Sequence, residues 1–285
     1  MTANLLTHSR MACAKTCLRK HYFQYELCLT RERVSEALSV GQGVHKGMET
    51  GDIPTLPDPV HQAIVTGLLN GYRWYWRDDK IDYLTREQEF TFPVRWQDDL
   101  RASRVTTAAG KIDAIIKLPD GRLAVMEYKT CSARLDPESD YWLRLRIDQQ
   151  ISHYMLGARA LGYDVETVLY DVIRRPTIRV KKTESPAQFA DRLYQDIKQR
   201  PEYYFCRREI PRLTADLDEY NIELQQQAAT LDEHRRQKSW YRNTSACLHP
   251  WRCEFLDICH TGVNLAQGVP EGFTVGKRHP ELTTG

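Results

Sequence analysis

Long apolar runs, a leader pattern and a strong charge imbalance are all missing from this sequence of 285 residues. No run approaches the roughly 18 apolar residues of a membrane-spanning helix, so we expect no membrane span. Residues 1–15 lack the charged-then-apolar order of a signal peptide, which favours a cytoplasmic protein. Lys and Arg number 40 against 38 Asp and Glu, so overall charge does not indicate a nucleic-acid binder.

Repeats and low-complexity tracts are also absent, and hydrophobic residues make up 41% of the chain, enough for a substantial core. Helices are predicted over 8–28, 35–50, 59–78, 140–161, 186–200 and 215–240. Strands are predicted over 83–96, 104–118, 122–130 and 165–173. We expect Gly41 and Gly43 to break the second helix. The order favours an α/β core sheet with a helical arm built from both termini.

The same patterns divide the chain into four segments. They are an N-terminal helical region over 1–82, a core over 83–206, a helical and Cys-rich segment over 207–262, and a tail over 263–285. The tail is rich in Gly, Pro and charge, so we expect it to be loosely ordered.

The string "GKIDAIIKLPDGRLAVMEYKT", residues 110–130, predicts a hairpin with charged side chains among apolar ones. Pro119-Asp120-Gly121 is a strong turn signal between two β runs. If the turn centres there, antiparallel pairing puts Asp113 opposite Glu127. Lys129 lies two residues beyond Glu127, so these side chains share a strand face. We therefore expect Asp113, Glu127 and Lys129 to converge on one patch.

The charges of this patch have two interpretations. Converging carboxylates repel each other unless a cation neutralises them, and oxygen ligands suit Mg²⁺ or Mn²⁺. A divalent cation beside a lysine is a setting in which water attacks a phosphodiester. A surface salt bridge between Lys129 and either acid explains the same spacing, and spacing alone does not separate the two.

The order Gly110-Lys-Ile-Asp113, then Glu127-Tyr-Lys129, resembles the PD-(D/E)XK nuclease superfamily. The match is closest to its RecB-like branch, which includes CRISPR-associated and phage exonucleases with four cysteines. "GVHKGME" offers His45 on a helix before the sheet, similar to the helical histidine of that branch. "DQQISHYML" offers Gln150 and Tyr154, which share a helix face and are similar to the branch's Gln-x-x-x-Tyr helix.

The resemblance implies a restriction-endonuclease-like fold, with a mixed central sheet flanked by helices and a Cys-rich helical subdomain from the two termini. The catalytic residues that it implies are Asp113, Glu127, Lys129, Gln150 and Tyr154. The ligands that it implies for Mg²⁺ or Mn²⁺ are His45, Asp113, Glu127 and the carbonyl of Tyr128. Lys129 would orient water and offset transition-state charge, while Gln150 and Tyr154 would position Lys129 or its strand. Glu87 and Glu89 lie on the strand before the hairpin and could add a ligand, but we interpret both as a solvated strand face.

Eight cysteines in a cytoplasmic protein are unlikely to form disulfides. "ACLHPWRCEFLDIC" groups Cys247, Cys253 and Cys259, and three thiolates need a fourth partner to hold a metal. The resemblance implies a [4Fe–4S] cluster completed by an N-terminal cysteine, Cys17 first and Cys13 next. Zinc is the alternative, because the C-x5-C-x5-C spacing departs from the commoner pattern of the family.

Basic residues with nearby aromatics suggest DNA contacts around Arg174, Arg207 and Lys238, although such charges usually solvate a surface. The function that the resemblance implies is metal-dependent exonuclease action on linear DNA ends, in recombination, repair, or CRISPR and phage processing. Its implied partners include recombination or CRISPR-adaptation proteins. The alternatives are a catalytically silent module that binds DNA or protein, and an iron–sulfur redox protein.

Overall fold

The computed structural model describes residues 4–32, 35–95 and 102–283, with the backbone alone for 102–105. The chain forms two compact units. The terminal unit comprises residues 1–33, 89–111 and 213–285, and the core unit comprises residues 34–88 and 112–212. Each unit therefore combines segments that are distant in the sequence, while the four segments predicted above stay predictions.

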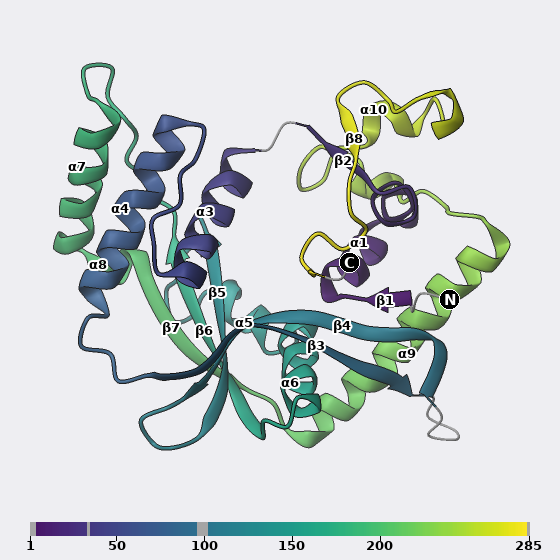
Figure 1. Ribbon diagram of the computed structural model, residues 1–285, viewed down its shortest axis with the longest axis horizontal. Coiled ribbons are helices and arrows are strands. Elements are labelled where there is room, and N and C mark those ends of the chain that lie inside the picture. Colours follow the sequence, from purple (N-terminus) through teal and green to yellow (C-terminus); the bar gives the residue numbers. More distant parts are fainter. Residues whose placement is uncertain (1–3, 33–34, 96–101, 284–285) are drawn as a thin grey trace. The chain divides into compact units, whose positions relative to one another are not determined.

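Six strands of the described chain form a mixed sheet (Figure 1) with the order β1-β4-β5-β6-β7, in which β3 also pairs with β4. The strands are β1 Asn4–Leu6, β3 Asp82–Arg95, β4 Ala102–Lys117, β5 Leu123–Cys131, β6 Val165–Arg174 and β7 Phe205–Pro211. The β4–β5 and β6–β7 pairs are antiparallel, whereas β1–β4 and β5–β6 are parallel. A mixed sheet with flanking helices confirms the predicted α/β class.

The four strands predicted from the sequence are confirmed to within two residues at each end. Strand β7 is not among the predicted strands, because its aromatic and basic residues suggest a DNA contact instead. Both faces of β6 are buried from Val168 to Ile173, as is typical of a strand inside a sheet. Strand β7 pairs with β6 on the side opposite β5.

The helices of the core unit are α3 Glu36–Thr50, α4 Pro59–Tyr75, α5 Asp140–Leu145, α6 Gln149–Ala160, α7 Pro186–Gln199 and α8 Pro201–Tyr204. Helix α3 continues through Gly41 and Gly43, contrary to the predicted break. A Cβ atom at Gly43 would lie 2.9 Å from the Val65 side chain, so this glycine permits close packing of α3 on α4. The predicted helix over 140–161 divides at Asp148, whose side chain caps α6.

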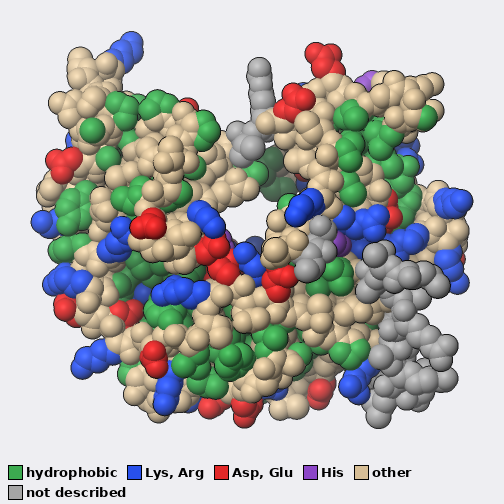
Figure 2. Space-filling model, in the orientation of Figure 1, with side chains coloured by type: hydrophobic (Ala, Val, Ile, Leu, Met, Phe, Trp, Pro, Cys, Tyr) green, Lys and Arg blue, Asp and Glu red, His purple; other side chains and the backbone are tan. Residues whose placement is uncertain are grey.

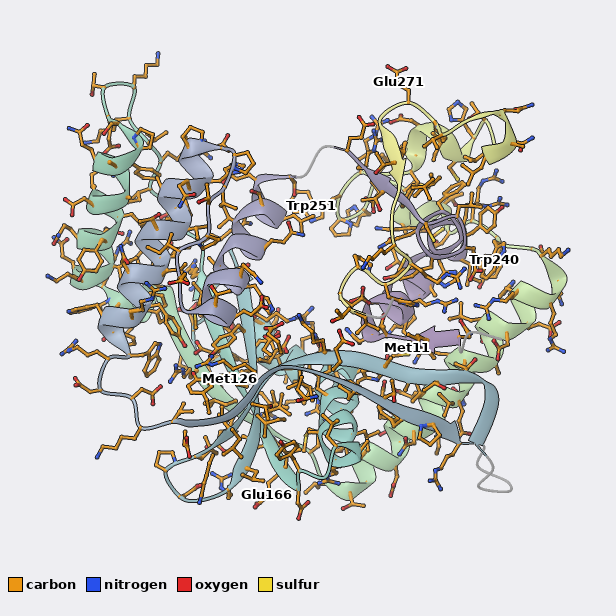
Figure 3. The ribbon with its side chains drawn as sticks, in the orientation of Figure 1. Met11, Met126, Glu166, Trp240, Trp251 and Glu271 are labelled. Atoms are coloured by element: carbon orange, nitrogen blue, oxygen red, sulfur yellow. The ribbon has the colours of Figure 1, made fainter. Side chains whose placement is uncertain are left out.

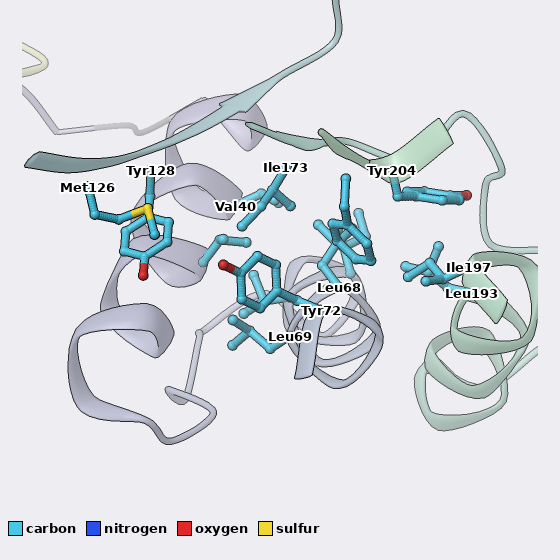
Figure 4. Close-up of a cluster of buried hydrophobic side chains, with 14 of the residues drawn as sticks. Val40, Leu68, Leu69, Tyr72, Met126, Tyr128, Ile173, Leu193, Ile197 and Tyr204 are labelled. Carbon is cyan, nitrogen blue, oxygen red and sulfur yellow. The ribbon is translucent and has the colours of Figure 1, made fainter. Parts of the chain in front are cut away.

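Helices α3, α4 and α7 pack with one face of the sheet to form the main core (Figure 4). Met126 and Tyr128 of β5 enter this core, as do Leu68 of α4 and Leu193 of α7. Because strand side chains alternate between faces, Glu127 and Lys129 of β5 lie on the other face. The hydrophobic core therefore fixes the strand that carries both charged residues.

Replacing Gly71 of α4 by alanine is expected to destabilise the protein by up to about 2 kcal/mol, the usual overpacking cost less the helix preference of alanine. The new Cβ would lie 2.7 Å from Cγ2 and 3.2 Å from Cβ of Ile197, a β-branched side chain with little freedom to move. This clash outweighs the roughly 1 kcal/mol by which alanine favours a helix over glycine. Urea unfolding measures the change, with the exposed neighbour Asn70→Ala as the control. A Gly71→Ala variant as stable as the wild type would contradict the packing.

The terminal unit contains short elements around one long helix. They are α1 His8–Thr16, α2 Leu18–His21, a π-helical turn at Tyr22–Glu26, β2 Leu29–Arg31, α9 Thr214–Gln237, α10 Leu256–Cys259 and β8 Phe273–Val275. Single 3₁₀ turns occur at Thr244–Ala246 and Leu265–Gln267. The helix predicted over 8–28 divides at Cys17, which is extended at φ −167°. No helix in the described ranges combines the length and apolarity needed to cross a membrane.

The structure differs from the expected loose tail over its described part, up to Thr283. Strand β8 pairs with β2, and the Phe273 ring stacks on Phe255 at 5.6 Å. Leu282 is also buried, at 4% exposed. Scattered apolar residues anchor this segment, which composition alone does not reveal.

His21 lies in a buried polar network of the terminal unit. Its Nε2 accepts a hydrogen bond from Arg10 Nε at 3.0 Å, and its ring stacks on Trp240 at 5.1 Å. Arg10 is fully buried and also pairs with Glu26 at 2.9 Å. Burial, followed by the Arg10 charge, lowers the pKa of His21 from 6.5 to about 2. The folded protein therefore holds this imidazole in its neutral form.

Stability is accordingly expected to fall as pH drops below about 6.5, because the unfolded chain protonates His21 and the folded chain does not. The slope from this one group reaches about 1.4 kcal/mol per pH unit and continues towards pH 2. Urea unfolding between pH 7 and pH 4 is expected to show a shallower slope for His21→Gln than for the wild type. The exposed His260→Gln is the control, and equal slopes for His21→Gln and wild type would contradict a buried neutral imidazole.

Candidate active site

The β4–β5 hairpin has the register that the sequence predicts. Ala114 pairs with Met126 and Lys117 pairs with Leu123, which continues to Asp113 opposite Glu127. Gly121, at φ +92°, closes the turn, where its N–H donates to Leu118 O at 2.9 Å. The Tyr128 N–H donates to Asp113 Oδ2 at 2.8 Å, which fixes the Asp113 carboxylate against β5. The turn chemistry therefore positions both acids.

Asp113 lies beside a histidine and a second acid from other elements of the core unit. His45 of α3 places Nε2 3.5 Å from Asp113 Oδ1 and 3.4 Å from Glu87 Oε1. One ligand atom from each of these three residues lies within 4.8 Å of the others, an arrangement that fits a metal ion. Nitrogen and carboxylate oxygen ligands of this kind suit a divalent cation such as Mn²⁺.

The position of Glu87 corrects the prediction of a solvated strand face. Glu87 has φ +51°, in the left-handed region that non-glycine residues rarely adopt within a strand. This conformation interrupts the alternation of β3 and turns the side chain inward, where it is 14% exposed. Backbone of this kind costs of order 1–3 kcal/mol and is concentrated at functional sites. Glu89 is hydrogen-bonded to Thr283 and lies outside this group.

Glu127 and Lys129 form an ion pair next to the start of α6. Lys129 Nζ lies 2.5 Å from Glu127 Oε1, and Gln150 Nε2 donates to the same oxygen at 3.1 Å. Gln150 Nε2 also donates to Tyr154 OH at 2.9 Å, one helical turn later. The structure thus brings Gln150 to Glu127, a residue of the strand that also carries Lys129.

The pKa values at this site are set by three neighbouring carboxylates, together with His45 and Lys129. Burial and the Glu127 carboxylate raise the pKa of Asp113 to about 7. The hydrogen bond to Glu87 raises the pKa of His45 to about 9, with a further contribution from Asp113. Burial opposes the charge of Lys129, but the adjoining Glu127 carboxylate outweighs it and raises the pKa of Lys129. Lys129 is therefore a cation at neutral pH and not a proton acceptor.

Two further observations fit a cation among these acids. Glu127 is 3% exposed, and its Oε2 is buried with no hydrogen-bond partner among the described residues. A buried carboxylate oxygen without a donor is costly, and a bound cation would satisfy it. A cavity of about 140 Å³ adjoins the group and is lined in part by His45, Tyr128 and Lys129. This space would admit a small anionic group beside the lysine.

Tyr128 contributes its side chain to the core, not to this group. Its hydroxyl lies 2.8 Å from the Tyr83 hydroxyl, and its ring packs edge-on against Tyr72. Its backbone lies between Glu127 and Lys129. The carbonyl remains a predicted ligand.

The four cysteines predicted to hold a metal line one cavity of the terminal unit, which has a volume of about 220 Å³. Cys17 lies between α1 and α2, Cys247 and Cys253 lie in the loop after α9, and Cys259 ends α10. Among the described residues, no three cysteine Sγ atoms lie within 4.8 Å of one another. The compact tetrahedron of a zinc site is therefore not formed. Trp251, labelled in Figure 3, comes from the same loop and is 83% exposed.

Several basic and aromatic residues suggested as DNA contacts are structural instead. Arg207 pairs with the fully buried Asp171 at 2.6 Å and also with Asp79. Trp240, which is labelled in Figure 3, is only 6% exposed, and Tyr204 is fully buried. On the face shown in Figure 2, Lys and Arg side chains lie interspersed with Asp and Glu side chains. The partners of Arg207 are distant in the sequence, so local sequence patterns do not reveal these ion pairs.

Comparison with known proteins gives one decisive match. A family model described as the PD-(D/E)XK nuclease superfamily matches residues 5–260. The chain belongs to the PD-(D/E)XK nuclease superfamily. Membership implies a metal-dependent nuclease, and the His45, Glu87 and Asp113 group is a place where its divalent metal could bind.

Two other comparisons add no argument about function. A solved structure titled "Crystal structure of SSO0001" is 13% identical to this nuclease, with a TM-score of 0.34. The match covers 79% of this chain and 78% of that chain. No curated protein sequence matches this nuclease.

Proposed function

We propose that this nuclease is a Mg²⁺- or Mn²⁺-dependent deoxyribonuclease of the RecB-like branch, acting as an exonuclease on linear DNA ends. The observation that carries the proposal is the convergence of Asp113, Glu127 and Glu87 with His45 and Lys129. Several neighbouring carboxylates repel each other, and a bound divalent cation would offset this repulsion. The positive charge of the adjacent lysine would stabilise the negative charge of a phosphodiester substrate.

Asp113, Glu127, Glu87 and His45 would hold the cation, with the Tyr128 carbonyl as a further ligand. A bound divalent cation would neutralise phosphate charge and lower the pKa of water. Tyr128 N–H orients Asp113, and Gln150 orients Glu127 through the oxygen shared with Lys129. Tyr154 in turn accepts a hydrogen bond from Gln150. These fixed donors hold both carboxylates in place before substrate arrives.

Lys129 has a distinct role in this proposal. Its ammonium group lies at the mouth of the site, with a side chain 33% exposed, while Glu127 beneath it is 3% exposed. A protonated lysine at this position orients the attacking water by donating a hydrogen bond. It also offsets the negative charge that develops on the scissile phosphate.

We further propose that Cys17, Cys247, Cys253 and Cys259 hold a [4Fe–4S] cluster. All four line one cavity, and a cluster holds its cysteines further apart than a zinc ion does. Cys13 is the less suitable ligand, because burial raises the pKa of its thiol to about 12. Protein purified without oxygen should be brown, with about four iron and four sulfide per chain. Colourless protein with one zinc would refute the cluster.

End-labelled linear DNA, single- and double-stranded, tests the nuclease proposal. We expect degradation with Mn²⁺ or Mg²⁺ that stops with a chelator and resumes when metal is added back in excess. A ladder that shortens from one end gives the polarity, and circular DNA is expected to resist. DNA that is bound but stays intact with saturating metal would replace the proposal by a silent DNA-binding module. Cutting of circular and linear DNA alike would refute exonuclease action.

A further inference from the structure

The segment 143–147, at the end of α5, exposes an unusual set of side chains. Leu143 is 59% exposed and Ile147 is 82% exposed, while Arg144 and Arg146 are also exposed. Isolated apolar residues on a surface are common, but two large ones that flank two cations within five positions form a defined patch.

The backbone beneath this patch is held rigidly. Trp142 and Leu145 are buried, and Trp142 Nε1 donates to Leu135 O at 3.1 Å. Arg212, 8% exposed, donates to the carbonyls of Leu145 at 2.8 Å and Asp148 at 3.1 Å. Four outward side chains therefore stand on a fixed base, which lowers the entropic cost of gripping a ligand.

The patch lies near the carboxylates of Asp113, Glu127 and Glu87, called here the acidic group, which belong to the same unit. Ile147 precedes Gln150 by three residues, a span of at most about 11 Å, and Gln150 contacts Glu127 at 3.1 Å. Tyr170 of β6 connects the two regions. It pairs in register with Glu127 of β5, and its ring lies 6.4 Å from the ring of Tyr141 in α5. The patch is therefore close enough for a strand bound at these carboxylates to reach it.

The positive charges of Arg144 and Arg146 are only weakly paired with acidic side chains. Arg144 has a long pairing with Asp148, at 3.9 Å, and its guanidinium lies over the Tyr141 ring at 5.9 Å. Among the described residues, Arg146 has no carboxylate within 4.0 Å. Exposed arginines with weak partners are suited to bind phosphate oxygens.

We propose that residues 143–147 bind a single DNA strand next to the scissile phosphate. Arg144 and Arg146 bind backbone phosphates, and Leu143 and Ile147 pack against the faces of unpaired bases. Only a strand without a partner exposes its base faces, so the apolar side chains select single-stranded over duplex ends. This inference rests on the proposed nuclease function and adds a substrate preference to it.

Binding without cleavage tests the cationic half of the patch. Fluorescence anisotropy would follow a labelled oligodeoxythymidine on Lys129→Ala protein with Mg²⁺, over a series of salt concentrations. We expect the added pair Arg144→Gln and Arg146→Gln to weaken binding about tenfold and to reduce the salt slope by about 1.4, the value for two phosphate contacts on a single strand. The control is Arg77→Gln, an arginine of similar exposure elsewhere in the core unit. An unchanged slope would overturn the phosphate contacts.

Ile147→Ser tests the apolar half. We expect it to weaken single-strand binding about threefold or more, and to leave blunt duplex binding unchanged. Leu38→Ser, at a 52% exposed leucine of α3, is the control. Equal loss for both DNA forms, or no loss, would overturn the single-strand selection. If the wild type binds DNA in this way but never cuts it, the nuclease proposal fails while the patch stands.

Discussion

Lys129→Ala is expected to lower the rate of DNA cleavage at saturating substrate by about 10²–10³-fold, the typical effect of removing one charge-stabilising donor from an active site. The ammonium group lies 2.5 Å from Glu127 and carries a raised pKa, so it is charged throughout the neutral range. Its loss removes the donor that orients the attacking water and offsets the negative charge of the transition state. The substrate concentration for half-maximal rate should therefore change much less than the rate itself.

Two variants make this result specific. Lys117→Ala removes an exposed lysine from the other arm of the same hairpin and should retain full activity. Asp113→Asn should abolish cleavage and also weaken Mn²⁺ binding, whereas Lys129→Ala should still bind Mn²⁺. Calorimetric titration with Mn²⁺ separates these effects. Undiminished cleavage by Lys129→Ala would place the chemistry in a different set of residues.

Arg207→Leu is expected to destabilise the protein by about 3–5 kcal/mol, the usual result of removing one partner from a buried ion pair. Arg207 Nε lies 2.6 Å from Asp171 Oδ2, and its Nη2 lies 2.6 Å from the Tyr72 hydroxyl. Tyr72 donates to the same Asp171 oxygen at 2.5 Å. Without Arg207, Asp171 is a fully buried carboxylate with one remaining donor on this oxygen.

The pH dependence of this variant follows from the charge balance. Burial already raises the pKa of Asp171, and Arg207 is the main group that opposes the rise. Removing Arg207 therefore raises the pKa further, so the folded variant binds a proton more tightly than the unfolded chain. The stability defect should be smallest in acid and should grow as pH rises through the folded pKa. Urea unfolding at several pH values measures it.

Controls on the same strand distinguish this network from a general loss of charge. Arg208→Leu removes a neighbouring arginine that donates to Pro137 O and covers the Trp142 ring, and should cost about 1 kcal/mol. Asp171→Asn combined with Arg207→Leu should recover part of the stability, because the buried charge is then absent. An Arg207→Leu variant no less stable than Arg208→Leu would contradict the network.

Local patterns in the sequence predict the hairpin and much of the sheet. Pro119-Asp120-Gly121 sets the turn, and apolar alternation sets the register, so the placement of Asp113 and Glu127 follows from neighbouring residues alone. Helix α3 could be predicted for the same reason, from the Ser35 cap and the spacing of Val40 and Val44. These features need no knowledge of the tertiary fold.

Other features depend on contacts between distant residues. Glu87 lies beside Asp113 and His45 because its backbone is left-handed, and the alternation of apolar residues along the strand does not predict that conformation. Arg207 appears to be a surface cation until Asp171 and Tyr72 are brought beside it by the fold. Gly41 and Gly43 predict a broken helix until the close approach of neighbouring side chains is known. For Arg207 and Gly41 the deciding partner lies more than twenty residues away in the sequence.

The most direct test of the central claim is an anomalous difference map from crystals grown with saturating Mn²⁺. The account predicts a peak among the carboxylates of Asp113, Glu127 and Glu87, next to His45 Nε2. Glu127 Oε2, which is buried without a partner among the described residues, should then contact the ion. A map with no peak there, or with Mn²⁺ bound only elsewhere, would contradict the account and leave the acids as a structural ion-pair group.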